Sequence, residues 1–404
     1  MAVANRELIR EINQFSILNT IRTSNAISRV EIARITGISR ASVTGITARL
    51  ISENLIFEKE IQDSSLRGRR RVMLALNPDA VYVVGVKISA FKVSFAVTNM
   101  EAGILSSLAI PIQTGKRPVE YIANLIEDGI RHCVEEAQLQ LKQISGIGIG
   151  IPGFIDSRSG ICHWTPLYQK GEIPLRDLIQ ERLKISTYIE NDANTITLGE
   201  QWFGQGKGID NFIVVTIEHG IGMGIVINSQ MYRGVKSIGA ECGHMVLIPE
   251  GTLCRCGKKG CLEAYVSDVS ILELARQAHA DQKWHADNIE QLTIEKVTAL
   301  AQKGQPVLRS IFKKAGEILG IGLSNLIHIF NPERIIITGE GVRAGDMLFV
   351  PMREAVNRHS HHEMLSSAKI LIQKWDDTDW ARGAASLVLQ ELYKSPLNRI
   401  KPTI

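Results

Sequence analysis

The chain has 404 residues, which is too many for one hydrophobic core, so we expect two or three domains. Hydrophobic residues make up 45% and charged residues 22%, as in a soluble globular protein, and no apolar run reaches the roughly 18 residues of a membrane helix. The net charge of +4 arises in the first 80 residues, which hold 12 Lys and Arg against 8 Asp and Glu.

This uneven charge indicates a small basic domain in front of a large neutral one. Such a layout is typical of a nucleic-acid-binding domain fused to a sensor domain. Glu7 and Glu11 lie among the first residues, so the N-terminus does not have the pattern of a secretory leader. We therefore expect a cytoplasmic protein without membrane insertion.

Three helices are predicted in the first 52 residues. Apolar residues at helical spacing over 6–22 predict the first, and Ser28 with Glu31 forms a capping box that opens the second. A turn at 36–38 leads to a third helix, in which Val43, Ile46 and Leu50 are expected to face inward and Thr47 outward. This order predicts a helix-turn-helix, although a small helical bundle with solvated charges would show a similar pattern.

In a helix-turn-helix the last of these helices enters the DNA major groove, where its N-terminal residues contact base edges. The predicted DNA-contacting residues on it are Ser39, Arg40, Ala41, Ser42 and Thr44.

Two short strands, at 55–61 and 72–76, are predicted next, and an arginine-rich connection lies between them. Arginines in such a connection, or wing, can follow the narrow minor groove of A·T-rich DNA. The predicted wing residues are Arg67, Arg69, Arg70 and Arg71. Residues 1–78 are thus expected to form a winged helix-turn-helix domain.

The rest of the chain alternates strands and helices twice, which predicts two α/β lobes. We expect a first lobe at 79–193, completed by a C-terminal helix at 380–395, and a second lobe at 194–379 that carries a dimerisation surface. In the first lobe, strands are predicted at 81–86, 93–98, 105–110 and 147–151, and a helix at 119–141. In the second lobe, strands are predicted at 212–217, 224–227 and 334–338.

Three cysteines and one histidine gather in a short segment of the second lobe. Three thiolates and an imidazole make the closed tetrahedral shell that a structural zinc ion prefers, and they leave no open position for an activated water. A disulfide fits poorly with only six cysteines in the chain and no leader. The predicted Zn²⁺ ligands are His244, Cys254, Cys256 and Cys261.

Residues 241–244 and 254–263, which contain these ligands, resemble the zinc motif of the ROK family, a group of sugar kinases and sugar-responsive repressors. Further motifs follow in the family's order at 149–153, 190–194, 220–222 and 338–342. The resemblance covers about residues 80–395. It implies an α/β fold with two actin-like lobes of the sugar kinase and ribonuclease H-like type, and a ligand cleft between the lobes. The N-terminal winged helix resembles the repressor branch, with its N-acetylglucosamine, glucose and xylose repressors.

The nucleotide-binding segments depart from the pattern of the family's kinases. Lys87 stands in place of an acidic residue, and 89–91 lacks the two glycines and the threonine that follow it there. Glu218 places a carboxylate where a phosphate needs hydrogen-bond donors, and Glu340 replaces a glycine. We therefore expect that the protein is not an enzyme.

Four sugar-binding positions of the family, in contrast, are kept as Asp192, Glu241, His244 and Glu263, whereas Pro166 stands where the kinases have an asparagine. Carboxylates accept hydrogen bonds from sugar hydroxyls, and His244 can bind zinc through one nitrogen and a hydroxyl through the other. Asp192 stands at the position of the kinase general base, although it could instead cap the helix after it. The expected sugar-binding residues are Asn191, Asp192, Glu241, His244 and Glu263.

The nature of the sugar remains open between a free sugar and a sugar phosphate. Trp164 or Tyr168 could stack on a sugar ring, but packing against the lobe is an equally good interpretation.

These features predict a transcriptional repressor of sugar uptake or catabolism genes that is controlled by a sugar or a sugar phosphate. One winged helix covers half an operator, so a homodimer or a dimer of dimers on palindromic DNA with A·T-rich flanks is expected. Two alternatives remain. Control by a protein partner from a sugar-uptake system is one, and an active ATP-dependent sugar kinase is the other.

Overall fold

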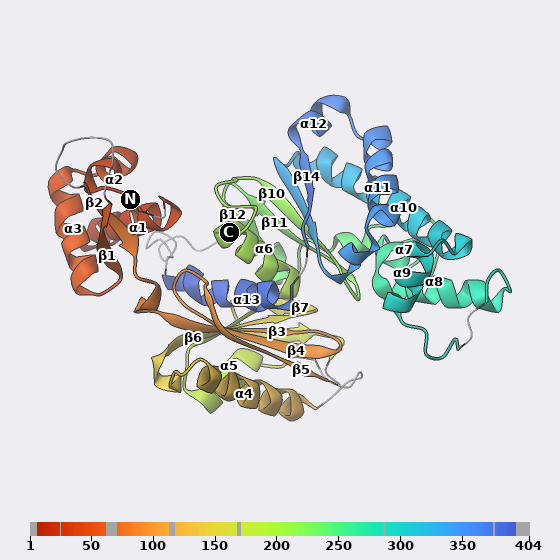
Figure 1. Cartoon of the computed structure of the whole chain (residues 1–404), viewed down its shortest axis with the longest axis horizontal. Coiled ribbons are helices and arrows are strands. Elements are labelled where there is room, and N and C mark those ends of the chain that lie inside the picture. The colour runs from red at the N-terminus through yellow and green to blue at the C-terminus, as the bar shows by residue number, and fades with distance from the viewer. Residues whose placement is uncertain are drawn as a thin grey trace.

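The computed structural model describes residues 6–24, 26–61, 71–112, 118–167, 171–285, 288–374 and 376–392. A small N-terminal domain lies at one end of the molecule, beside two larger α/β parts (Figure 1). Each α/β part is built on a five-stranded sheet. Among the described residues, no helix is both long and apolar enough to cross a membrane.

The N-terminal domain has three helices and a two-stranded antiparallel sheet, as predicted. Its elements are α1 (Arg6–Ser24), α2 (Arg29–Thr36), α3 (Arg40–Ser52), β1 (Ile56–Ile61) and β2 (Arg71–Leu76). The capping box is present, since Ser28 Oγ accepts from Glu31 N–H and the Glu31 carboxylate accepts from Ser28 N–H. Gly37 ends α2 with a φ of 70°, a conformation that glycine adopts without strain.

The expectation that Thr47 faces outward is wrong. Thr47 is fully buried, and its hydroxyl accepts a hydrogen bond from Arg29 Nε at 3.0 Å. Positions 43, 47 and 50 share one face of a helix, so Thr47 lies with Val43 and Leu50 in the core of the domain. Thr47 fixes α2 against α3 and is not available to DNA.

The first lobe contains a sheet with the strand order β5-β4-β3-β6-β9. The hairpin strands β3, β4 and β5 are antiparallel, whereas β6 and β9 continue the sheet parallel to β3. Their bounds are β3 (Tyr82–Ile88), β4 (Lys92–Thr98), β5 (Ile104–Pro111), β6 (Ile144–Ile151) and β9 (Thr187–Asn191). The helices α4 (Val119–Glu136) and α5 (Leu175–Leu183) cover one face of this sheet (Figure 1).

The helix predicted at 119–141 is shorter than expected. It ends at Glu136, and Gln138 follows with a φ of 58°, which breaks the helical path before Leu141. A separate 3₁₀ turn then forms at Leu141–Gln143. The hairpin of β7 (Phe154–Asp156) and β8 (Ile161–Trp164) lies beside β9.

The second lobe repeats the same sheet pattern with the order β12-β11-β10-β13-β14. The strands are β10 (Phe212–Ile217), β11 (Ile221–Ile227), β12 (Gln230–Tyr232), β13 (Arg334–Thr338) and β14 (Lys369–Ile372). The helices are α6 (Asp192–Phe203), α7 (Glu263–Val266), α8 (Asp268–Ala280), α9 (Ile294–Gln302), α10 (Pro306–Phe330), α11 (Asp346–His359) and α12 (His362–Ser367). In both sheets three antiparallel strands are followed by two parallel ones, so the fold is duplicated.

The last described helix, α13 (Asp377–Leu392), packs on the first sheet, as expected for a C-terminal helix that returns to the first lobe. It lies very close to β3 and β6, because Gly85 and Gly148 have no side chains. A Cβ added there would be 1.7 and 1.9 Å from the carbonyl oxygens of Ala381 and Ala384. These two glycines therefore allow α13 to lie directly on the sheet.

The helices α6 and α13 pack against each other and against the N-terminal domain. Ala385, Val388 and Leu389 of α13 share a buried core with Ile17 and Ile21 of α1. At the end of α6, Trp202 and Phe203 pack against the same core. The N-terminal domain is thus anchored on α6 and α13.

Candidate functional site

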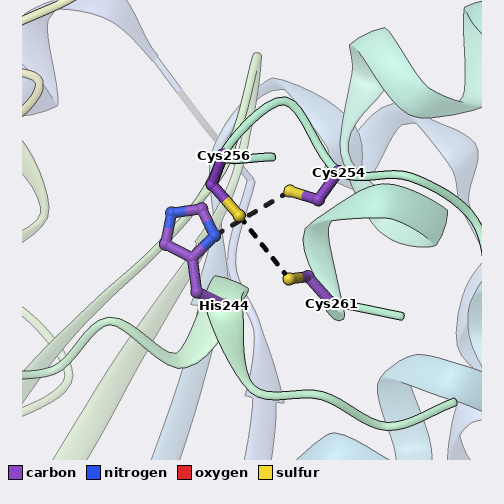
Figure 2. Close-up of side chains that lie close together, drawn as sticks. All are labelled: His244, Cys254, Cys256 and Cys261. Atoms are coloured by element: carbon purple, nitrogen blue, oxygen red, sulfur yellow. Dashed lines mark hydrogen bonds between the residues drawn. The ribbon is translucent and has the colours of Figure 1, made fainter. Parts of the chain in front are cut away.

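The four predicted metal ligands lie together in the second lobe. His244 ends a 3₁₀ turn (Cys242–His244), and the three cysteines come from the loop at 254–261. One ligand atom from each residue lies within 4.8 Å of the others (Figure 2). Cys254 Sγ is 3.9 Å from His244 Nδ1, and Cys256 Sγ is 3.7 Å from Cys261 Sγ.

These distances fit one tetrahedral ion better than a disulfide. Zinc–sulfur bonds of about 2.3 Å place two tetrahedral ligands about 3.8 Å apart, whereas the sulfurs of a disulfide are about 2.05 Å apart. All six cysteines are free thiols in the structure. Three soft sulfur ligands and one imidazole are also the donor set that favours zinc over magnesium or calcium.

Glycines allow this loop to turn tightly around the cluster. Gly260 has a φ of 78°, and a Cβ on it would lie 1.8 Å from the carbonyl oxygen of Ile248. Gly257 also has a positive φ, of 84°. The loop is closed further by backbone pairing between Val246 and Cys261.

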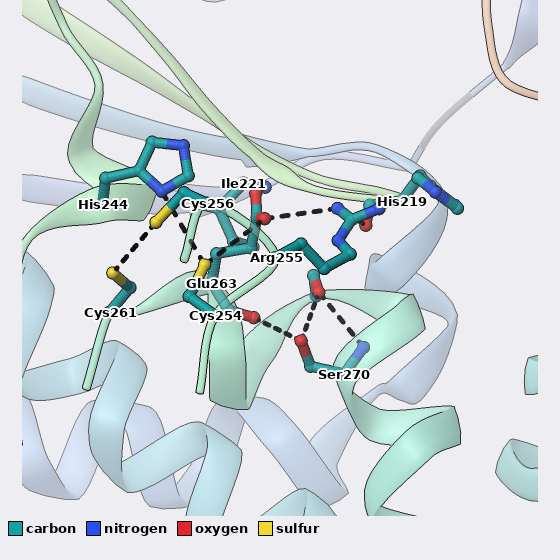
Figure 3. Close-up of polar contacts among 10 residues, drawn as sticks. His219, Ile221, His244, Cys254, Arg255, Cys256, Cys261, Glu263 and Ser270 are labelled. Carbon is teal, nitrogen blue, oxygen red and sulfur yellow. Dashed lines mark hydrogen bonds and ion pairs between the residues drawn. The ribbon is translucent and has the colours of Figure 1, made fainter. Parts of the chain in front are cut away.

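Glu263 connects the metal loop to the turn between β10 and β11 (Figure 3). Its carboxylate accepts from the N–H of Ile221 at 3.1 Å and from Arg255 Nη2 at 3.2 Å. A Cβ at Gly220 would lie 2.6 Å from the carboxylate, so a larger residue there would displace the Glu263 side chain. Each carboxylate oxygen has a second lone pair, and Glu263 therefore retains the capacity to accept from a ligand hydroxyl.

Sequence reasoning missed Arg255, which lies between two metal ligands. Its Nη2 donates to the carbonyl oxygen of His219 at 3.0 Å as well as to Glu263. Arg255 thereby holds the loop at 218–220 against the metal loop. The only signal in the sequence was a basic residue between Cys254 and Cys256.

Asn191 and Asp192 lie where β9 passes into α6. Asn191 is the helix cap, since its Oδ1 accepts from Asn194 N–H at 3.2 Å and its Nδ2 donates to Gly153 O at 3.1 Å. The alternative interpretation of Asp192 as the cap is therefore wrong. Asp192 Oδ1 accepts from the adjacent Ala193 N–H at 3.0 Å.

The carboxylates of Asp192, Glu241 and Glu263 come close enough to influence one another. Burial raises the pKa of Glu241 to about 7, and the charges of Asp192 and Glu263 add to this rise, although part of Glu241 remains exposed. Burial also raises the pKa of Asp192, against the opposing effect of Lys87. The structure thus gathers acidic hydrogen-bond acceptors at one site next to the metal cluster.

A buried ion pair occupies the segments in which the family's kinases bind nucleotide. Lys87 Nζ, at the end of β3, lies 2.9 and 2.8 Å from the two carboxylate oxygens of Glu218, after β10. The Trp380 ring centroid is 3.6 Å from the same ammonium group. In the sequence Lys87 and Glu218 look like separate obstacles to phosphate, but in the structure they are partners that join the two lobes.

The other altered kinase positions also contact one another. Lys92 Nζ is 3.5 Å from the Glu340 carboxylate, and the rings of Phe91 and His219 meet edge to face at 5.4 Å. Bulk and paired charges therefore fill the positions of the nucleotide loops.

Of the two aromatic candidates for sugar stacking, only Trp164 can be placed. It is 49% exposed, and its ring centroid lies 5.5 Å from that of Phe154. Tyr168 lies outside the described residues.

The predicted DNA-contacting residues of α3 form an exposed surface at its N-terminus. Ser39 caps the helix by accepting from Ser42 N–H at 3.2 Å. Arg40, Ala41 and Thr44 are exposed on the first turns, as Ser39 and Ser42 are. In the predicted wing, Arg67, Arg69 and Arg70 lie outside the described residues, and for Arg71 only its backbone place at the start of β2 is described.

Comparison with known families and proteins agrees with this architecture. The ROK family model matches residues 83–391, and the MarR family model matches residues 11–60. The xylose repressor of Caldicellulosiruptor bescii is 30% identical, over 98% of this chain and 99% of that protein.

Two solved structures extend the comparison. A ROK family transcriptional regulator, a homologue of the E. coli MLC protein, has a TM-score of 0.82 at 26% identity and covers 97% of this chain and 98% of its own. A ROK family glucokinase from Streptomyces griseus, in complex with glucose and AMPPNP, has a TM-score of 0.67 at 28% identity and covers 76% of this chain and 98% of its own. The chain therefore belongs to the ROK family.

Proposed function

We propose that this protein is a DNA-binding transcriptional repressor of sugar uptake or catabolism genes, and that a sugar bound between the lobes controls its operator binding. The observation that carries this proposal is the packing of the winged helix on α6 and α13. Asn191 and Asp192, two of the candidate sugar-binding residues, lie at the start of α6. The helix α6 thus connects the proposed sugar site directly to the DNA-binding domain.

Kinase activity is not part of the proposal, because the nucleotide loops are filled by protein groups. The ammonium of Lys87 and the carboxylate of Glu218 neutralise each other, so neither is free to hold phosphate or metal. We assign the retained acidic groups to sugar binding alone. The residues proposed for that role are Asn191, Asp192, Glu241, His244 and Glu263.

We further propose that His244, Cys254, Cys256 and Cys261 hold a structural Zn²⁺ ion. The ion would fix the loop from which Glu263 reaches the turn before Ile221. This assignment rests on the donor set and on the separations within the cluster.

In this proposal the protein acts as a homodimer in the cytoplasm, where it binds its operator DNA. One α3 helix reads a half-site, so two copies related by a two-fold axis match a palindromic operator. The two lobes would then set the distance between the paired winged helices, and sugar binding would change it.

Arg40→Ala is expected to reduce the preference for operator over scrambled DNA by about 5-fold or more per half-site, because one bidentate Arg–guanine contact contributes about 1–3 kcal/mol of discrimination. Fluorescence anisotropy with both DNAs, at one fixed salt concentration, measures this preference. Arg49→Ala is the matched control. Arg49 lies at the other end of α3 and is paired with Glu53 at 2.6 Å, so its loss should leave discrimination unchanged. Unaltered discrimination in the Arg40 variant would contradict the assignment of α3.

Trp202→Leu is expected to weaken the effect of sugar on DNA binding. The affinity for sugar without DNA and the affinity for DNA without sugar should both stay nearly unchanged. The Arg22 guanidinium of α1 lies 4.1 Å from the Trp202 ring centroid, and Arg22 Nη1 donates to Trp202 O at 3.4 Å. Allosteric coupling is typically about 1–3 kcal/mol, so the loss of this contact should remove a large part of it. DNA affinity measured with and without a saturating sugar gives the coupling. If the ratio equals that of the wild type, the signal does not pass through this contact.

A further inference from the structure

The ion pair of Lys87 and Glu218 lies beside the proposed sugar site. Lys87 is in the same row across the first sheet as Gly150 of β6 and Glu190 of β9. Asp192 follows Glu190 by two residues, at the carboxyl end of β9. The charge of Lys87 accordingly reaches Asp192, where it opposes the effect of burial on the pKa of that carboxyl.

The donors of the Lys87 ammonium are already engaged. An ammonium group has three N–H donors, and Lys87 Nζ lies 2.9 and 2.8 Å from the two carboxylate oxygens of Glu218. The face of the Trp380 ring covers it at 3.6 Å from the centroid, and Lys87 is only 3% exposed. Although Lys87 is a buried cation next to the sugar site, it therefore offers a ligand neither a free donor nor a net charge.

Three further cations are each paired with a carboxylate. Arg255 is paired with Glu263, Lys92 with Glu340, and Arg233 with Glu190, at 3.2, 3.5 and 2.6 Å respectively. Asp192 and Glu241, in contrast, have no cation within ion-pair distance among the described residues.

The chemistry of the site therefore favours hydroxyl groups over phosphate. A phosphate monoester requires several hydrogen-bond donors and positive charge, which the paired cations named above do not offer. The hydroxyls of an uncharged sugar donate to carboxylates and bring no charge with them.

We propose that the Lys87–Glu218 ion pair is a specificity determinant that restricts the cleft to uncharged sugars and excludes sugar phosphates. This inference rests on the proposed sugar-binding function. Glu218 excludes phosphate by neutralising Lys87, and it would do so without touching the sugar itself.

Thermal melting of the full-length protein with matched ligands tests the proposal, because a ligand that binds the native state raises the midpoint. The probes are glucose, N-acetylglucosamine and xylose, each compared with its phosphate monoester. One free sugar is expected to raise the midpoint, and its phosphate is expected to bind at least tenfold more weakly. Glu218→Gln leaves the charge of Lys87 uncompensated and should improve the affinity for the phosphate form at least tenfold.

The control is the double variant Lys87→Gln/Glu218→Gln, which removes both charges. It should show no gain for the phosphate form, and it remains informative if the single variant folds poorly. Stronger binding of a phosphate than of its free sugar by the wild type would overturn the specificity proposal while leaving sugar control intact. Absence of any gain in a folded Glu218→Gln variant would overturn it as well. If no sugar binds in either form, the proposed function fails, and the specificity proposal fails with it.

Discussion

Replacing Cys256 by serine is expected to release the bound metal and to lower the melting temperature by about 10 °C. Zinc present at 1,000 times its Kd would stabilise the fold by about 4 kcal/mol, and each kcal/mol corresponds to about 2–4 °C in a domain of this size. Cys256 is the exposed one of the three cysteine ligands, so serine costs little in packing. The lower melting temperature would therefore report the release of the metal and not a disturbed core.

Cys242→Ser is the matched control for this experiment. Cys242 is buried in the same region, two residues before His244, but it is not part of the cluster. If burial alone determined the effect, Cys242→Ser would lower the melting temperature more than Cys256→Ser. If metal ligation determines it, Cys256→Ser lowers the melting temperature more. Zinc content by atomic emission, measured with the melting curves, distinguishes the two. A Cys256 variant that keeps one zinc per chain and the wild-type midpoint would contradict the assignment.

Replacing Lys87 by methionine is expected to cost about 3–5 kcal/mol of stability, because it leaves the buried carboxylate of Glu218 without its partner. Urea unfolding at pH 8 measures the loss. Burial raises the pKa of Glu218 to about 7, with Lys87 opposing the rise. In the folded variant Glu218 therefore binds a proton at a higher pH than it does in the unfolded chain. The loss of stability should shrink as the pH falls from 8 towards 6.

The double variant Lys87→Met/Glu218→Gln should regain most of that stability. Replacing a buried ion pair by uncharged groups is often neutral, whereas removing one partner leaves an uncompensated charge. A single variant as stable as the wild type would show that the pair does not form. A double variant less stable than the single one would show that the two residues act independently.

Local patterns in the sequence predicted most of the winged helix and all four members of the metal cluster. Ser28 and Glu31 are three residues apart, and Gly37 follows the helix that they open, so short-range geometry fixes these elements. The metal cluster was equally accessible, because its ligands lie within one short segment. Alternating apolar segments predicted four of the five strands in the first sheet and three of the five in the second, whereas β9, β12 and β14 were not predicted.

Contacts between segments that are far apart in the chain could not be predicted from local sequence patterns. Lys87 and Glu218 are 131 residues apart, and only the arrangement of the two lobes brings their charges together. Arg22 and Trp202 meet for the same reason. Thr47 was misplaced because a polar side chain on a helix can be buried when a neighbour such as Arg29 satisfies it.

The central claim is that sugar controls DNA binding, and one titration tests it most directly. A labelled DNA duplex from the promoter of adjacent sugar-utilisation genes is titrated with the full-length protein by fluorescence anisotropy, in the absence and presence of each free sugar. The account predicts specific binding that one sugar weakens about 5- to 150-fold, in line with a coupling energy of about 1–3 kcal/mol. Specific binding that no sugar changes would contradict it.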